Sequence, residues 1–90
     1  MVGDWKIVES QPCPLPEKVA TAFSEAIAGL IGASYTPVAF VGQQLVSGMN
    51  YALICDQTIV TRDPAKHVVL MKIYAPLSGK ATATSIEQLI

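Results

Sequence analysis

The most reactive side chains of this chain are those of two cysteines, Cys13 and Cys55, and one histidine, His67. A nucleophile needs a base within hydrogen-bond reach, and no Ser or Cys partner for His67 can be identified in the sequence. We therefore interpret His67 as a solvated residue at the start of a strand, and Cys55 as a small apolar residue within one. One histidine and two distant cysteines also cannot complete a zinc shell. The prediction is a protein that is not an enzyme, with no catalytic residue, no metal site and no cofactor.

The stretch QQLVSGMNY, residues 43–51, is suited to a different chemistry, that of noncovalent contact. Gly48 tolerates the positive φ that a tight hairpin requires. Val46 is stiff and apolar, so it loses little rotamer freedom when it is buried by a partner. Ser47 is small enough for a close approach of the backbone, and Gln44 can offer its amide to main-chain groups. The stretch is either a plain hairpin turn or a surface loop presented to a partner.

A helix and several strands must position this stretch. The apolar spacing predicts a helix over residues 16–31, with Pro16 in its first turn, Glu17 at the positive end of the helix dipole and Gly32 as the C-terminal cap. The predicted buried stripe consists of Val19, Phe23, Ala26, Ile27, Leu30 and Ile31.

Four segments after the helix are rich in β-branched and aromatic residues and predict strands at residues 34–46, 49–60, 67–76 and 81–89. A fifth strand, at residues 4–8, is expected at the edge. The connections are too short for parallel crossovers, so the strands must form antiparallel hairpins. The predicted fold is α+β, with one long helix packed across a four- to five-stranded antiparallel sheet in a single domain, residues 1–90.

Composition limits the classes of partner. The chain has 90 residues, 51% of them apolar and 14% charged, and its formal charge is −1. With no basic patch, nucleic acid is not an expected partner, and no apolar run approaches the roughly 18 residues of a membrane span. Asp4, Lys6 and Glu9 interrupt the start of the chain where an export signal would be apolar. We expect a soluble, cytoplasmic domain whose cysteines are thiols.

Gln44, Val46 and Gly48 form a Q-x-V-x-G pattern, which resembles the signature of the cystatins, inhibitors of papain-like cysteine proteases. Asn50 and Tyr51 extend it in the way that is common in that family. The order of elements is also similar, and the chain most resembles the stefins, the intracellular branch without disulfides. SQPCPLPEKV resembles the run into a stefin helix, and LMKIYAPLSG resembles the strand and second hairpin of a stefin.

The resemblance implies a cystatin-like fold and a wedge that fills the cleft of a papain-like cysteine protease reversibly and without covalent chemistry. The wedge would combine an N-terminal trunk of residues 1–3, the first hairpin and a second hairpin of residues 76–79. This second hairpin has Pro-Leu where stefins have Leu-Pro. The protease-binding residues implied are Val2, Gly3, Gln44, Leu45, Val46, Ser47, Gly48, Pro76 and Leu77.

The resemblance also implies a monomer that can exchange its first hairpin with a second copy in a domain-swapped dimer. Two alternatives remain open because a fold does not determine a function. The first is a non-inhibitory binding or self-assembly module of the same fold, and the second is a redox-responsive protein acting through Cys13. Only the inhibitor needs all three wedge elements exposed on one edge.

Overall fold

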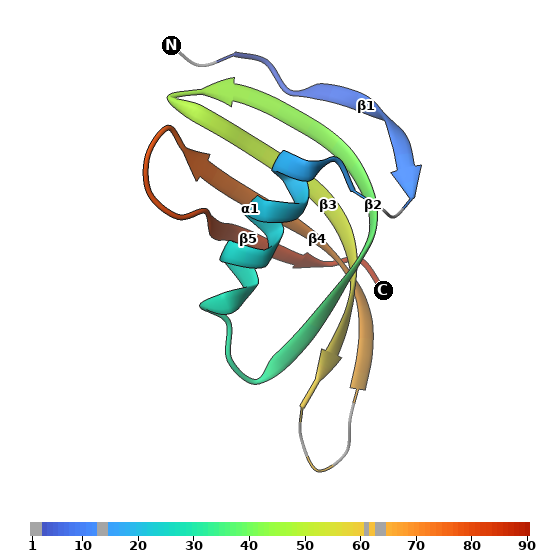
Figure 1. Ribbon diagram of the computed structural model, residues 1–90. Coiled ribbons are helices and arrows are strands. Elements are labelled where there is room, and N and C mark those ends of the chain that lie inside the picture. Colours follow the sequence, from blue (N-terminus) through green and yellow to red (C-terminus); the bar gives the residue numbers. More distant parts are fainter. Residues whose placement is uncertain (1–2, 13–14, 61, 63–64) are drawn as a thin grey trace.

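A computed structural model describes residues 3–12, 15–60, 62 and 65–90. The elements in them are, in chain order, β1 (Lys6–Pro12), α1 (Glu17–Ala28), β2 (Ala33–Val46), β3 (Gly48–Ile59), β4 (Ala65–Pro76) and β5 (Thr82–Gln88). The five strands form one antiparallel sheet in the order β1-β2-β3-β4-β5, and the helix lies across one of its faces (Figure 1). The predicted α+β class and antiparallel sheet are confirmed for the described residues.

The helix is shorter than predicted at both ends. Pro16 is its N-cap, and the carbonyl of Pro16 accepts a hydrogen bond from the Ala20 amide at 2.9 Å. The helix ends at Ala28 and is capped by Gly29, because glycine is a poor helix former and the chain must turn there toward β2. Gly32, the predicted cap, instead has a φ of +89° in the connection to β2. Among the described residues, no helix has the length and apolar character needed to cross a membrane.

The core lies between the helix and the central strands. Val19, Phe23 and Ala26 of the predicted stripe are buried, and Ile27 and Leu30 pack against the core from its margin. Ile31 is 98% exposed, so its place in the stripe was wrong because the helix has already ended. The sheet contributes a layer of fully buried side chains, namely Leu53, Cys55, Val69, Met71 and Ile73. Cys55 thus packs as a small apolar residue, as predicted.

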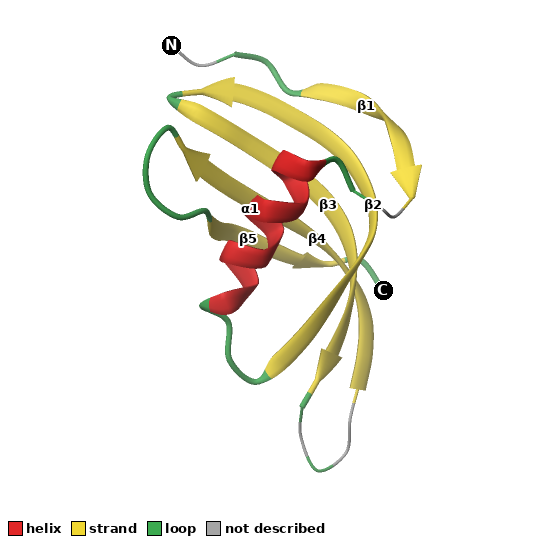
Figure 2. Ribbon diagram, in the orientation of Figure 1, coloured by secondary structure: helices red, strands yellow, loops and turns green. Residues whose placement is uncertain are grey.

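Two bulges bend β2 around the helix. Its pairing with β3 shifts by one residue between Pro37 and Ala39, and again between Phe40 and Gly42. Each extra residue increases the local twist and bends the strand. The bend is visible in Figure 2, where β2 curves from the lower end of the helix to the hairpin at the opposite end of the sheet. The end of β2 is thereby brought to the same edge as the N-terminal segment.

Truncating Leu53 to Ala should lower the free energy of unfolding by about 3 kcal/mol, because Leu53 is fully buried and the change leaves a cavity. The matched control is Leu77→Ala, which removes the same atoms from a side chain that is 87% exposed. That variant should stay within about 0.5 kcal/mol of the parent chain. Urea denaturation of the three proteins measures both differences, and equal losses would contradict the burial described above.

Candidate functional site

Three segments distant in sequence meet at one edge of the molecule, which we call the hairpin edge. It consists of the N-terminal segment (residues 3–5), the first hairpin (residues 45–49, between β2 and β3) and the second hairpin (residues 76–80, between β4 and β5) (Figure 1). The Gly3 amide donates to the Leu45 carbonyl at 2.7 Å, and Gly48 pairs with Pro76. The first hairpin therefore lies between the other two segments.

Gln44 joins the N-terminal segment to the first hairpin. Its Nε2 donates to the Gly3 carbonyl at 2.8 Å. Its Oε1 accepts a hydrogen bond from Asn50 Nδ2 at 2.9 Å. Both residues belong to the pattern noted in the sequence, but the carbonyl that Gln44 binds lies in a segment 41 residues away along the chain.

The tip of the first hairpin is a very tight turn. Val46 pairs with Gly48, so Ser47 alone connects the two strands. Gly48 has a φ of +116°, which confirms the prediction that glycine is needed here. A Cβ atom on Gly48 would overlap the Ala75 carbonyl oxygen and lie 2.9 Å from the Cα of Pro76. The turn is held from β4 as well, because Tyr74 Oη donates to the Ser47 carbonyl at 2.6 Å.

The exposed apolar side chains of the hairpin edge differ in part from those expected. Leu45 is 66% exposed and Leu77 is 87% exposed. Val46, which the sequence suggested as the projecting side chain, is partly buried. Leu45 pairs with Met49 across the sheet, and both side chains border the groove between the hairpins and the helix. The two leucines are therefore the apolar contacts that this edge offers.

A groove of about 620 Å³ lies behind the hairpins, between them and the first half of the helix. Its floor includes Met49 and Tyr51, and Leu45 and Leu77 border it. Glu25 bridges the groove at one end, where its Oε1 accepts a hydrogen bond from the Ala81 amide at 3.2 Å. This bond ties the second hairpin to the helix.

Trp5 packs on the opposite face of the sheet from the helix. Its ring lies against Gly42, where an added Cβ would be 3.6 Å from the Trp5 Cε3. Ala52 pairs with Gly42 and is almost fully buried, although its side chain is on the side away from the helix core. Lys72 Nζ lies 5.5 Å from the centre of the Trp5 ring, within the range of a cation–π contact. Trp5 therefore packs on the sheet near its edge.

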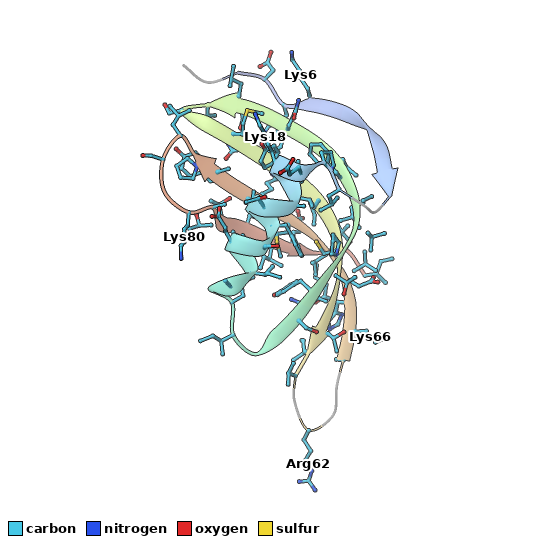
Figure 3. All side chains as sticks on the ribbon, in the orientation of Figure 1. Lys6, Lys18, Arg62, Lys66 and Lys80 are labelled. Carbon is cyan, nitrogen blue, oxygen red and sulfur yellow. The ribbon has the colours of Figure 1, made fainter. Side chains whose placement is uncertain are left out.

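The cationic side chains labelled in Figure 3 fall into two groups at the two ends of the molecule. Lys6, Lys18 and Lys80 lie toward the hairpin edge, whereas Arg62 and Lys66 lie at the far end, near the β3–β4 connection. His67, in β4, is half-buried, and its Nδ1 lies 3.3 Å from the Ile90 carbonyl oxygen. In the part of the chain that the structure describes, no three His, Cys, Asp or Glu side chains gather as a metal site would require.

The structure brings together most of the residues singled out in the sequence. One group is on the first hairpin and its strand: Gln44, Leu45, Val46, Ser47 and Gly48. Gly3 lies on one side of it, and Pro76 and Leu77 lie on the other. Val2 and Cys13 lie outside the described residues.

Sequence reasoning missed two contributors, Asn50 and Tyr74. Asn50 was noticed only as part of a motif, and no local pattern marks Tyr74. The pairing of Gln44, Asn50 and Tyr74 across three strands would have identified them, but that requires the register of the sheet. No protein-family model, curated protein or solved structure matches the chain.

Two glycine substitutions test the close approach at the first hairpin. Gly48 and Gly79 both have positive φ, at +116° and +100°. A Cβ atom on Gly79 meets nothing closer than the Pro76 Cγ at 3.8 Å, whereas one on Gly48 overlaps the β4 backbone. Gly79→Ala should therefore cost only the conformational penalty, about 1 kcal/mol, and Gly48→Ala should cost clearly more. Thermal unfolding of both variants gives the comparison, and equal losses would mean that β4 moves aside freely.

The same close approach limits which residues the first hairpin tolerates at Gly48. Gly48 is buried, so a bulky residue there displaces the hairpin from β4 as well as blocking a partner. Val46 itself does not have a positive φ, since glycine alone among the described residues has one. Leucine truncations are thus a cleaner probe of binding than a change at Gly48.

Proposed function

We propose that this protein is a reversible, noncovalent inhibitor of papain-like cysteine proteases, which inserts the hairpin edge into the active-site cleft. The observation that carries the proposal is the joining of all three wedge elements on one edge. The amide of Gln44 links the N-terminal segment to the first hairpin, and the pairing of Gly48 with Pro76 links the first hairpin to the second. A simple hairpin turn would not need these links.

The proposed mechanism depends on shape and apolar burial. The hairpin edge brings no nucleophile to the cleft, so no covalent bond to the catalytic cysteine is formed. Full burial of a leucine side chain contributes about 1.5–3 kcal/mol, and Leu45 and Leu77 are both largely exposed in the free chain. The main-chain links keep these side chains in place before binding, which lowers the entropy that binding must overcome. Val2 and Gly3 would lie along the non-primed side of the cleft, and Gly48 and Ser47 would allow the backbone to pass close to the catalytic centre.

A binding module of the same fold is the second candidate. The sheet face away from the helix carries Trp5 and Val38, which are 40% and 42% exposed, beside the paired and only half-buried Ile54 and Leu70. These side chains form an apolar surface that protease inhibition does not use. A partner that binds there would be unaffected by changes at the hairpin edge.

Titration of papain with the purified chain tests the first proposal. Inhibition should be reversed on dilution, and the chain should be recovered uncleaved. Alkylation of the folded protein with a thiol reagent should leave inhibition unchanged, because the mechanism uses no thiol of the inhibitor. Loss of inhibition on alkylation would favour the redox alternative. Absence of binding to papain and to other proteases of its class would leave the binding module.

Leu45→Ala and Leu77→Ala should each weaken binding to the protease about tenfold, because each removes apolar surface that the complex buries. The matched control is Ile31→Ala, which truncates a side chain that is 98% exposed but lies beyond the far end of the helix. Its inhibition constant should equal that of the parent chain. The inhibition constants of the three variants test this prediction. If neither leucine change alters the inhibition constant, the hairpin edge is not the surface that contacts the protease.

Mild heating should produce a dimer that does not inhibit. Ser47 is the single residue between paired strands, so opening the turn would join β2 and β3 into one long strand. Two copies could then exchange strands and recover the same pairing between chains, at the expense of the hairpin. Size-exclusion chromatography of the heated chain, followed by inhibition assays on each peak, measures this. A dimer as inhibitory as the monomer would contradict either the exchange or the site.

A further inference from the structure

Three polar side chains form a row across the sheet face that is turned away from the helix. Gln44 of β2 pairs with Asn50 of β3, which pairs with Tyr74 of β4. Asn50 donates to Gln44, Gln44 donates to Gly3, and Tyr74 donates to Ser47. The row therefore contacts both the N-terminal segment and the tip of the first hairpin.

The direction of each amide in this row follows from elementary chemistry. The Gly3 carbonyl can only accept, so the group of Gln44 that faces it must be the Nε2 donor. The Oε1 of Gln44 then points the other way and needs a donor, which Asn50 Nδ2 provides at 2.9 Å. Asn50 thus determines which end of the Gln44 amide reaches the N-terminal segment.

We propose that Asn50 is a positioning residue, which acts through Gln44 to hold the N-terminal segment against the first hairpin in the free protein. If the bond from Gln44 is lost, one described hydrogen bond still joins Gly3 to the first hairpin. It runs from the Gly3 amide to the Leu45 carbonyl. Regular pairing of β1 with β2 begins only at Lys6, opposite Gln43. The side-chain relay therefore adds to the Gly3 amide bond and the packing of Trp5 in holding the segment before Lys6.

The consequence for binding rests on the proposed function. A protease cleft that accepts the N-terminal segment and the first hairpin together gains most when the two are already side by side. The relay would then lower the entropy lost on binding without itself touching the protease. Asn50 would affect affinity only through the N-terminal segment.

The test substitution is Asn50→Asp, which preserves the shape of the side chain but replaces the donor with an acceptor. Gln44 must then either face the carboxylate with its own oxygen or rotate and face the Gly3 carbonyl with that oxygen. The first arrangement sets two oxygens against each other, whereas in the second Nε2 donates to the carboxylate in a charge-assisted hydrogen bond, so the rotated amide is favoured. The Gly3 carbonyl then loses its donor, and the N-terminal segment should detach. Trp5 is the only tryptophan of the chain and lies in this segment, so its fluorescence reports the detachment. We expect emission shifted to longer wavelength in the variant, measured on the free protein at neutral pH.

The matched control is Gln57→Glu, the same amide-to-acid change on the same strand. Gln57 Nε2 donates to Tyr35 Oη at 2.9 Å, far from the N-terminal segment. The Trp5 emission of the Gln57→Glu variant should equal that of the parent chain. Gln44→Glu provides a second variant, which breaks the relay at its other member and should give the same shift. Unchanged emission in folded Asn50→Asp and Gln44→Glu, confirmed by circular dichroism, would overturn the proposal.

A measurement on the parent chain needs no variant at all. The Nε2 proton of Gln44 that is donated to the Gly3 carbonyl should exchange with solvent more slowly than the Nε2 protons of an exposed glutamine such as Gln88. Equal exchange rates by NMR would overturn the relay even if every variant failed to fold.

Protease binding adds a separate readout. Asn50→Asp should weaken inhibition about three- to tenfold, the range for loss of one hydrogen bond, and should have no effect in a chain that lacks residues 1–3. An equal loss in both backgrounds would show that Asn50 does not act through the N-terminal segment. If the parent chain inhibits no protease, the proposed function fails, while the fluorescence and exchange experiments still decide on the relay.

Discussion

The backbone of Gly48 passes so close to the end of β4 that no side chain fits between them, and the arrangement of the hairpin edge depends on this contact. A Cβ atom there would overlap the Ala75 carbonyl oxygen. Glycine also supplies the positive φ that turns the chain after Ser47. These two demands meet at one residue, so the first hairpin turns tightly and lies directly against the second. Any larger residue would separate the two hairpins and disperse the surface that they form together.

The two faces of the sheet stabilise different parts of the structure around this contact. The face under the helix is a closed apolar layer, centred on Leu53, Met71 and Ile73, which supplies the stability of the domain. The other face carries polar side chains and Trp5, which hold the N-terminal segment and the first hairpin. Trp5 lies against Gly42 there, and Asn50 donates to the side-chain oxygen of Gln44. The hairpin edge is therefore supported by side chains that are not themselves at its tip.

The support of the hairpin edge by side chains behind it affects how this edge can bind a partner. Leu45 and Leu77 are exposed, yet the main chain of Leu45 is held by a hydrogen bond and by strand pairing, and Leu77 directly follows Pro76, which pairs with Gly48. Exposed apolar side chains on a rigid support are typical of contacts that lose little entropy on association.

The sequence by itself determined the elements and their order. Apolar spacing identified the helix, short connections required antiparallel pairing, and the backbone freedom of glycine marked the turn at Gly48. These features depend on residues close together in the chain. The predicted end of the helix was wrong because Gly29, Leu30 and Ile31 continue the apolar pattern of the helix. The chain nevertheless leaves the helix after Ala28 and turns toward β2.

Only the tertiary structure decided which side chains form the candidate site. Whether Leu45 or Val46 is the more exposed depends on strand register and on how far the helix extends over the sheet. Two bulges in β2 change that register, and no pattern of residues in the sequence predicts them. The partner of Gln44 is a backbone carbonyl 41 residues away, and every residue has such a carbonyl. Long-range contacts of this kind follow from the packing of whole elements, since main-chain groups carry no signature in the sequence.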